Sequence, residues 1–506
     1  MENRLSINIE YCKVLTKLND YQTVLNLVNE LLPVCKYETD KTELQILKTR
    51  CLVGQGELIE GKDLMELLIA SISDLSRKNT LLLDLANVNF NLNNYAETEK
   101  ICNNLISLKN INPELLGSSY QLLGLISIYK NNDLDSALQF FEKTNSVYQN
   151  GCLKFRQAEI LMNIGNIYSM KGDVEQALAY WNQSFNLNQS IGNMQQEAKL
   201  LVNFGIYYFN SLEFEKSTEN YTKAYSIFNS FGIKDGQGLV ESNLGEIYLL
   251  MCEYQKAFDL LNDSIKVFRQ LQNKEEELQA LFLLGKLYFT IGDNGKLLQL
   301  IKEFDSSIKE EPSETHKNNF EYLLNLSKIL DGDLNNILHS LTEVRTKISI
   351  DERKYDYFSC TMNIVQIMIK LNILDEAVVE LRSEKLIELC NENNIFEAEK
   401  DYMLGIISEL NPLLGSIPSL DYFLTAYNLM INLHITELTW KILYALFRFY
   451  STRGNINKSR EYAKYSKLLI KYIAENINDR RLRSLYLKEA ERNKALNELN
   501  YYEEQF

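Results

Sequence analysis

Small, aromatic and apolar residues recur along the middle of the chain with a period of 40 residues. Each period has a glycine, a tyrosine three residues later and a small or apolar residue twelve residues later: Gly165, Gly205, Gly245 and Gly285; Tyr168, Tyr208, Tyr248 and Tyr288; Ala177, Ser217, Ala257 and Leu297. Bulky and then small residues follow at four and seven residues further on: Trp181, Tyr221 and Leu261, then Ser184, Ala224 and Ser264. This i, i+4, i+7 spacing is typical of a buried helix face. Each period therefore predicts two antiparallel helices that cross closely at the small residues.

The period continues outside this central stretch. Counting in steps of 40 reaches Ala137 upstream and Ile337 and Ala377 downstream. Gly-Asp pairs recur in the expected turn between helices, where glycine permits a left-handed stop and aspartate caps the next helix: Gly172-Asp173, Gly292-Asp293 and Gly332-Asp333. Pro412 and Pro418 interrupt the register and predict a kink or an insertion there.

Composition supports an all-α chain. Only 5 prolines and 21 glycines occur among 506 residues, which is too little turn chemistry for many short strands. The net charge of -15 argues against whole-surface binding to nucleic acid or to an anionic membrane. Eight cysteines are scattered without a C-x-x-C pair, so we expect them to be reduced core residues. The sequence has neither a signal peptide nor a long apolar run, so we expect a cytoplasmic protein with no membrane partner.

The central stretch resembles the tetratricopeptide repeat (TPR), specifically its 40-residue variety found in kinesin light chains, Pins-type adaptors and Rap-type bacterial peptide receptors. The segment from Asn163 to Leu178, NIGNIYSMKGDVEQAL, reproduces the first helix, the turn and the start of the second helix of that repeat. The resemblance implies a right-handed α-solenoid superhelix, here of about twelve TPR-like helical hairpins plus a C-terminal capping helix. We expect four parts: degenerate repeats over 1–118, well-matched repeats over 119–300, degenerate repeats over 301–410, and C-terminal repeats with a basic capping helix over 411–506.

No pattern predicts catalysis, a metal or a cofactor. The segment from Gly56 to Asp63 imitates a phosphate-binding loop, but aspartate replaces the required Ser or Thr, so a turn between helices is the better interpretation. The glycines from Gly232 to Gly238 are interpreted as a connection between repeats. His316, His339 and His434 are far apart and lack a metal-binding companion.

An asparagine column is the strongest candidate for a binding site. Asn163, Asn203 and Asn243 each lie two residues before a repeat glycine, and Asn363 is on the same 40-residue count, while Leu283 and Leu323 occupy the positions between. The TPR resemblance implies that the first helices line a concave groove, where an asparagine ladder grips the backbone of an extended peptide. The alternative is that the column only caps or solvates the groove. Beside it we expect further peptide-binding residues of mixed charge, with Phe209 and Phe289 either lining pockets or forming core: Asn166, Asn210, Lys199, Glu246 and Lys286.

The C-terminal stretch is basic. Between Arg453 and Lys494 stand twelve Lys or Arg and five Asp or Glu, so this segment carries +7 and the rest of the chain carries -22. We expect a terminal helix from about Asp479 to Glu498 that folds back on the array, either as a cap or to modulate access to the groove. Its apolar seam would consist of Leu482, Leu485, Tyr486, Leu496 and Tyr501, and its charged docking residues would be Arg480, Arg481 and Arg483.

The leading hypothesis is a non-enzymatic adaptor or sensor that binds a protein or peptide in the concave groove. A regulatory or scaffold subunit whose partner carries the catalysis would use the same groove. The alternative from another class is a nucleic-acid-associated helical-repeat protein that uses the basic C-terminal region.

Overall fold

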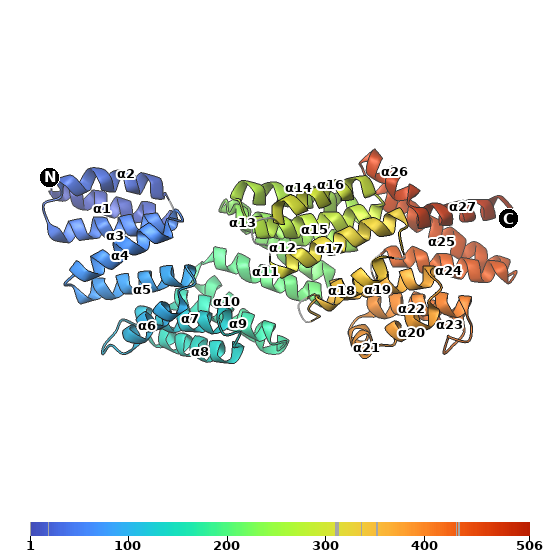
Figure 1. Ribbon diagram of the computed structural model, residues 1–506, viewed down its shortest axis with the longest axis horizontal. Helices are drawn as coiled ribbons and strands as arrows, with labels where there is room; N and C mark the ends of the chain where they lie inside the picture. Colours follow the sequence, from blue (N-terminus) through green and yellow to red (C-terminus); the bar gives the residue numbers. More distant parts are fainter. Residues whose placement is uncertain are drawn as a thin grey trace. The chain divides into compact units, whose positions relative to one another are not determined.

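The computed structural model describes residues 2–18, 20–308, 313–334, 336–350, 353–431, 433 and 436–505. Within these residues the chain is built from α-helices and one short 3-10 helix, without a strand (Figure 1). Successive helices pair as antiparallel hairpins, and neighbouring hairpins stack. The expected all-α solenoid is therefore confirmed.

The chain forms two compact units, residues 1–200 and 201–506. The helices that begin in the first unit are α1 (Glu2–Lys17), α2 (Tyr21–Leu31), α3 (Glu38–Gly54), α4 (Leu58–Ser71), α5 (Leu75–Asn91), α6 (Tyr95–Ile106), α7 (Pro113–Tyr129), α8 (Leu134–Asn150), α9 (Lys154–Met170), α10 (Val174–Ile191) and α11 (Met194–Asn210).

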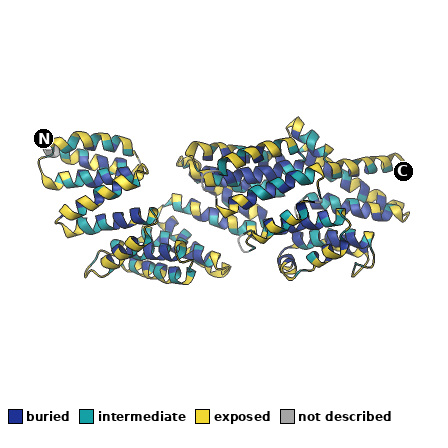
Figure 2. Cartoon of the chain, in the orientation of Figure 1, coloured by how far each residue is buried: buried dark blue, intermediate teal, exposed yellow. Residues whose placement is uncertain are grey.

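The helices of the second unit after α11 are α12 (Phe214–Ser230), α13 (Lys234–Leu250), α14 (Tyr254–Leu271), α15 (Lys274–Ile291), α16 (Asn294–Ile308), α17 (Glu314–Asp331), α18 (Ile337–Thr346), α19 (Lys354–Lys370), α20 (Leu374–Leu381), α21 (Glu384–Asn391), α22 (Asn394–Leu410), α23 (Ser419–Met430), α24 (Glu437–Thr452), α25 (Ile456–Glu475), α26 (Arg480–Lys488) and α27 (Ala490–Gln505). Buried residues follow the inner faces of the hairpins in each unit (Figure 2).

The close crossings are where the sequence predicts them in three repeats. A Cβ atom at Gly165 would lie 2.4 Å from the Trp181 ring of α10, and one at Gly205 would lie 2.5 Å from the Tyr221 ring of α12. At Gly245 the neighbour is Leu261 of α14, 2.8 Å away. Only a residue without a side chain lets these helices approach so closely.

The fourth glycine corrects the prediction. Gly285 is buried, but its nearest neighbour is Leu323 of α17, the next first helix, and not a residue of α16. The second helix of this repeat has Leu297 where the other repeats have Ala177, Ser217 or Ala257. Because the larger leucine holds α16 further from α15, the space above Gly285 is filled by α17.

Hydroxyl groups mark the same crossings in repeats that look degenerate in sequence. Ser217 Oγ donates to the Gly205 carbonyl at 2.7 Å, and Thr98 Oγ1 donates to the Ala86 carbonyl at 3.3 Å with the same separation of twelve residues. A second hydroxyl, 26 residues after its acceptor, recurs in Ser184 to Ala158, Ser264 to Gly238 and Ser466 to Trp440. The α5–α6 and α24–α25 hairpins therefore use the same packing as the central repeats.

The turns between helices and the break near Pro412 and Pro418 are also where the sequence predicts them. Gly172, Gly292 and Gly332 all have positive φ angles, of 77°, 78° and 79°. Gly56 is a turn residue with a φ of 91°, while Gly61 lies inside α4, so the segment that imitates a phosphate-binding loop is the connection of a helical hairpin. Residues 411–418, which include both prolines, separate α22 from α23.

Six of the eight free cysteines are buried as expected, and Cys35 and Cys152 are not. Cys152 is exposed in the turn after α8, with a φ of 54°. Its neighbours in the 40-residue pattern are turn residues such as Gly192 and Gly232.

The C-terminal segment folds back on the second unit, as predicted, but as two helices. Asp479 caps α26, and the chain bends at Glu489 before α27 begins. Leu482 and Tyr486 are buried in the same core as residues of α14, α15 and α24. The predicted seam is wrong at Tyr501, which is exposed, because the neighbouring Tyr502 makes the contact with Ser459 and Phe447.

Arg492 connects this segment to two distant helices, α15 and α24, and also binds α26. Its guanidinium donates to the carboxylate of Glu437 at 3.0 Å, to the Thr290 carbonyl at 2.6 Å and to the Tyr486 carbonyl at 2.7 Å. Glu437 also accepts from the hydroxyl of Tyr254 at 2.7 Å and from the indole of Trp440 at 2.6 Å. The C-terminal helices are thus part of the core of the second unit and close its last hairpins against α14 and α15.

Candidate functional site

The asparagine column lies on first helices in both units. Asn163 is in α9 of the first unit, whereas Asn203 in α11 and Asn243 in α13 belong to the second. All three side chains are partly exposed. At the equivalent positions of α15 and α17, Leu283 and Leu323 are buried in the core.

The column therefore changes character after α13. Asn363 of α19 is also partly exposed, but its amide donates to the hydroxyl of Tyr322 at 3.0 Å. Asn166 accepts from the indole of Trp181 at 2.9 Å, so it supports the crossing of α9 and α10. In α11, by contrast, Lys199, Ile206 and Asn210 are exposed on or beside the face that carries Asn203.

A cavity of about 40 Å³ lies at the end of that face in the second unit. Its lining brings the end of α11 together with α19, α21 and α22, and it includes both Phe209 and Asn210, which are expected beside the asparagine column. The lining residues are Phe209, Asn210, Leu212, Lys354, Tyr355, Leu389, Glu392, Asn393 and Phe396. A space of this size accommodates water molecules rather than a ligand.

Four charged residues form a compact cluster next to this cavity: Glu246 of α13, Lys286 of α15, Asp356 of α19, and Arg353 directly before α19. Lys286 Nζ lies 2.9 Å from Asp356 and 3.6 Å from Glu246, and Arg353 lies 2.7 Å from the same Asp356. Lys286 is buried, which corrects the expectation that it is open on the groove surface. Two cations and two anions balance each other here, so the cluster joins α13, α15 and α19 without a net charge.

The pKa values follow from these pairs. Burial alone would raise the pKa of Asp356, but Lys286 and Arg353 hold it below its usual value. Burial would lower the pKa of Lys286, and Asp356 and Glu246 raise it instead. Burial raises the pKa of Glu246. Arg353 and Asp356 carry no sequence pattern that predicts this cluster, because their i, i+3 spacing at a helix start indicates at most a local ion pair.

The three candidate arginines of the C-terminal segment are used differently. Arg481 pairs with Asp293 at the start of α16, and the Nε of Arg483 donates to the Ile477 carbonyl at 2.8 Å. Arg480 is exposed. Two of the three guanidinium groups thus bind their own chain, while Arg492, which was not singled out from the sequence, is the most deeply buried cation of the segment.

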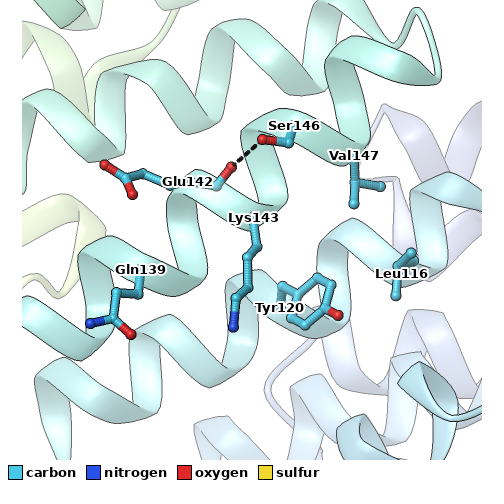
Figure 3. Close-up of a pocket in the computed structure, with 7 residues that line it drawn as sticks. All are labelled: Leu116, Tyr120, Gln139, Glu142, Lys143, Ser146 and Val147. Atoms are coloured by element: carbon cyan, nitrogen blue, oxygen red, sulfur yellow. Dashed lines mark hydrogen bonds between the residues drawn. The ribbon is translucent and has the colours of Figure 1, made fainter.

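An open hollow of about 440 Å³ lies between α7 and α8 in the first unit (Figure 3). Lys143 extends beside Tyr120, with its ammonium 5.9 Å from the ring centroid. Ser146 donates to the Glu142 carbonyl, so its hydroxyl is engaged within α8. The polar side chains that line this hollow do not gather around a common point, so the hollow does not resemble a catalytic or ligand-binding site.

The remaining candidates for chemistry do not converge either. His316 is buried at the start of α17 beside Ser313, and burial lowers its pKa. His339 is exposed and lies 3.4 Å from Glu343, and His434 is outside the described residues. Among the residues that the structure describes, no group of three His, Cys, Asp or Glu side chains could hold a metal ion. None of the helices within those ranges has the length and apolar character needed to cross a membrane.

Glu399 of α22 supplies a prediction for the pH dependence of stability. Burial raises its pKa to about 7, although Lys441 opposes the shift. The folded chain therefore holds this proton more tightly than the unfolded chain, and its stability falls as the pH rises from about 4 to 7. We expect Glu399→Gln to raise the free energy of unfolding by about 1–3 kcal/mol at pH 8 and to change it little at pH 4.

The measurement is urea unfolding of both chains across this pH range. Glu388→Gln is the matched control, because it removes an exposed carboxyl group on the neighbouring α21 instead of a buried one. A stability gain for Glu399→Gln that is the same at pH 4 and pH 8 would contradict the raised pKa.

Comparisons with known proteins identify the fold. No protein-family profile matches the sequence, and no curated protein is similar to it in sequence. Among solved structures, a chain of the APC/C hetero-tetramer Cut9-Hcn1 is 12% identical with a TM-score of 0.51, over 98% of this chain and 98% of that chain. A signal transduction ATPase with a tetratricopeptide repeat sensor from Pyrococcus horikoshii is 14% identical with a TM-score of 0.47, over 66% and 53% of the two chains. Aspartyl phosphate phosphatase F from Bacillus subtilis is 13% identical with a TM-score of 0.46, over 77% and 93%. The TPR resemblance is confirmed at the level of the fold.

Proposed function

We propose that the chain is a protein-interaction solenoid that holds an extended segment of a partner protein against the first-helix face of α11 and α13. The observation that carries this proposal is the change along the asparagine column. Asn203 and Asn243 are partly exposed, whereas Leu283 and Leu323 at the same repeat position are buried. The part of the column on α11 and α13 can therefore contact a partner, whereas the equivalent positions on α15 and α17 belong to the hydrophobic core.

The chemistry of the open part fits a peptide backbone. An asparagine amide both donates and accepts, so it can pair with a main-chain carbonyl and amide regardless of the partner's side chains. Lys199 and Asn210 on α11 add polar groups of mixed character, and Ile206 between them adds an apolar contact. Asn163 presents the same group on α9 in the first unit.

The experiment needs the partner segment first. A photoreactive residue in place of the exposed Ile206 would cross-link the segment in the native cell, and the segment would then be synthesised and titrated against purified variants. We expect the double change Asn203→Ala and Asn243→Ala to weaken binding by about 1 kcal/mol for each lost hydrogen bond, while the melting curve stays nearly unchanged.

Asn220→Ala is the matched control, because Asn220 is partly exposed like the column asparagines but lies on the second helix α12, where its amide donates to the Lys216 carbonyl of the same helix. It should leave the affinity unchanged. Equal affinity of the double variant and the control would reject the asparagine ladder as the binding site.

A further inference from the structure

The outward face of α25 differs from those of α8, α10, α12 and α14, the second helices of the central repeats. Along these four helices, large apolar side chains are exposed only at the helix ends, and the outward positions between them are polar. From the middle of α25 to its last turn, by contrast, Tyr465, Leu468 and Tyr472 are 46%, 57% and 48% exposed. Their spacing of three and four residues places them in one apolar strip along the helix.

A basic strip runs beside this apolar strip. Arg460, Lys464, Lys467 and Lys471 follow each other at intervals of four, three and four residues, so they share the neighbouring side of α25. Lys467 forms an ion pair with Glu503 of α27, so this lysine of the strip is already paired within the chain. Lys464 and Lys471 are exposed, and no acidic side chain within the described part of the chain forms an ion pair with either of them.

Two parallel strips of this kind define the chemistry of a complementary surface. A helix that packs on α25 would cover the apolar strip with its own apolar stripe, since side-chain rows of two helices interdigitate. Residues on one flank of that stripe would then face Lys464 and Lys471, where carboxylates are favourable and ammonium groups are not.

We propose that α25 binds an amphipathic helix of a partner protein that carries acidic residues along one flank of its apolar stripe. Nucleic acid fits less well, because Leu468, the most exposed residue of the strip, lies between the two rings and offers no stacking surface. A second copy of the chain also fits less well, because an antiparallel two-fold contact through α25 would place its unpaired lysines against each other. The surface is on a second helix, so it is independent of the first-helix face.

The test uses a synthetic fluorescein-labelled helix with leucines at i, i+3 and i+7 positions and glutamates along one flank, titrated into the full chain by fluorescence anisotropy. We expect it to bind at least about tenfold more tightly than the same peptide with lysines in place of glutamates, and the difference should shrink as salt rises. The double change Lys464→Glu and Lys471→Glu should reverse the preference between the two peptides. Because both lysines are exposed, the melting curve should be unaltered.

A matched control is Lys223→Glu with Lys266→Glu, which makes the same change of net charge on α12 and α14. It should leave the preference for the acidic peptide intact. Three results would overturn the proposal: equal affinity for both peptides, tighter binding of a single-stranded oligouridine that Lys464→Glu and Lys471→Glu abolish, or self-association of the chain that Leu468→Glu abolishes. The second would make α25 a nucleic-acid surface, and the third would make it a contact between copies.

Discussion

Arg492→Met is expected to destabilise the second unit by about 3–5 kcal/mol. The change removes a buried guanidinium and leaves the Glu437 carboxylate without its cation, in contact with Tyr254 and Trp440. A buried charge that loses its partner costs this much because solvent does not replace the lost interactions. The carbonyls of Thr290 and Tyr486 lose their donor as well.

Urea unfolding followed by tryptophan fluorescence measures this effect. The two tryptophans of the chain report on different units, since Trp181 is in the first and Trp440 in the second. Arg480→Met is the matched control, because Arg480 is exposed on the adjacent α26, and it should change stability by less than about 0.5 kcal/mol. Identical unfolding midpoints for the two variants would show that the contacts of Arg492 contribute nothing to stability.

Gly205→Leu should destabilise the crossing of α11 and α12 by several kcal/mol. Even the Cβ of an alanine would lie 2.5 Å from Cε1 of Tyr221, and a leucine has three further carbon atoms with no space to occupy. Overpacking of this kind typically costs about 1–3 kcal/mol and displaces neighbouring helices in addition. Thermal melting of the variant would measure the loss.

A second glycine provides a control for which replacement should raise the free energy of unfolding instead of lowering it. Gly295 lies in α16, and a Cβ there would have no neighbour closer than 3.7 Å. Gly295→Ala should therefore stabilise the chain by about 0.5–1 kcal/mol through helix propensity alone. A Gly205→Leu chain that melts like the wild type would reject the assigned helix register.

The local part of the architecture could be predicted from the sequence. A helical hairpin depends on residues within about 20 positions of each other, so the 40-residue period indicated the crossings at Gly165, Gly205 and Gly245 and the turns at Gly172 and its equivalents. The environment of Gly285 could not be predicted in the same way. It depends on Leu297 and Leu323 together, and only the packed structure shows which of the two helices fills the space.

The site was predictable only in part, for the same reason. The position of the asparagines on first helices follows from the repeat, but their exposure depends on how closely successive first helices pack. The cluster of Glu246, Lys286, Arg353 and Asp356 joins residues up to 110 positions apart in the sequence, and no local spacing indicates it. The position of Arg492 between α15, α24 and α26 has no sequence signal at all.

The closure of the second unit by its last helices has a consequence for the order in which the chain folds during synthesis. Tyr254 leaves the ribosome long before Glu437 and Arg492, which are 183 and 238 positions further along the chain. At ordinary translation rates of about 5–20 residues per second, this delay is on the order of 10–50 seconds. Each hairpin of the first unit can pack on its predecessor as soon as it emerges, whereas the apolar side of α14 waits for residues that are translated 183 or more positions later. Nascent chains of intermediate length therefore expose an unfinished core, and chaperones that bind apolar surface should act on this protein mainly between the translation of α14 and that of α27.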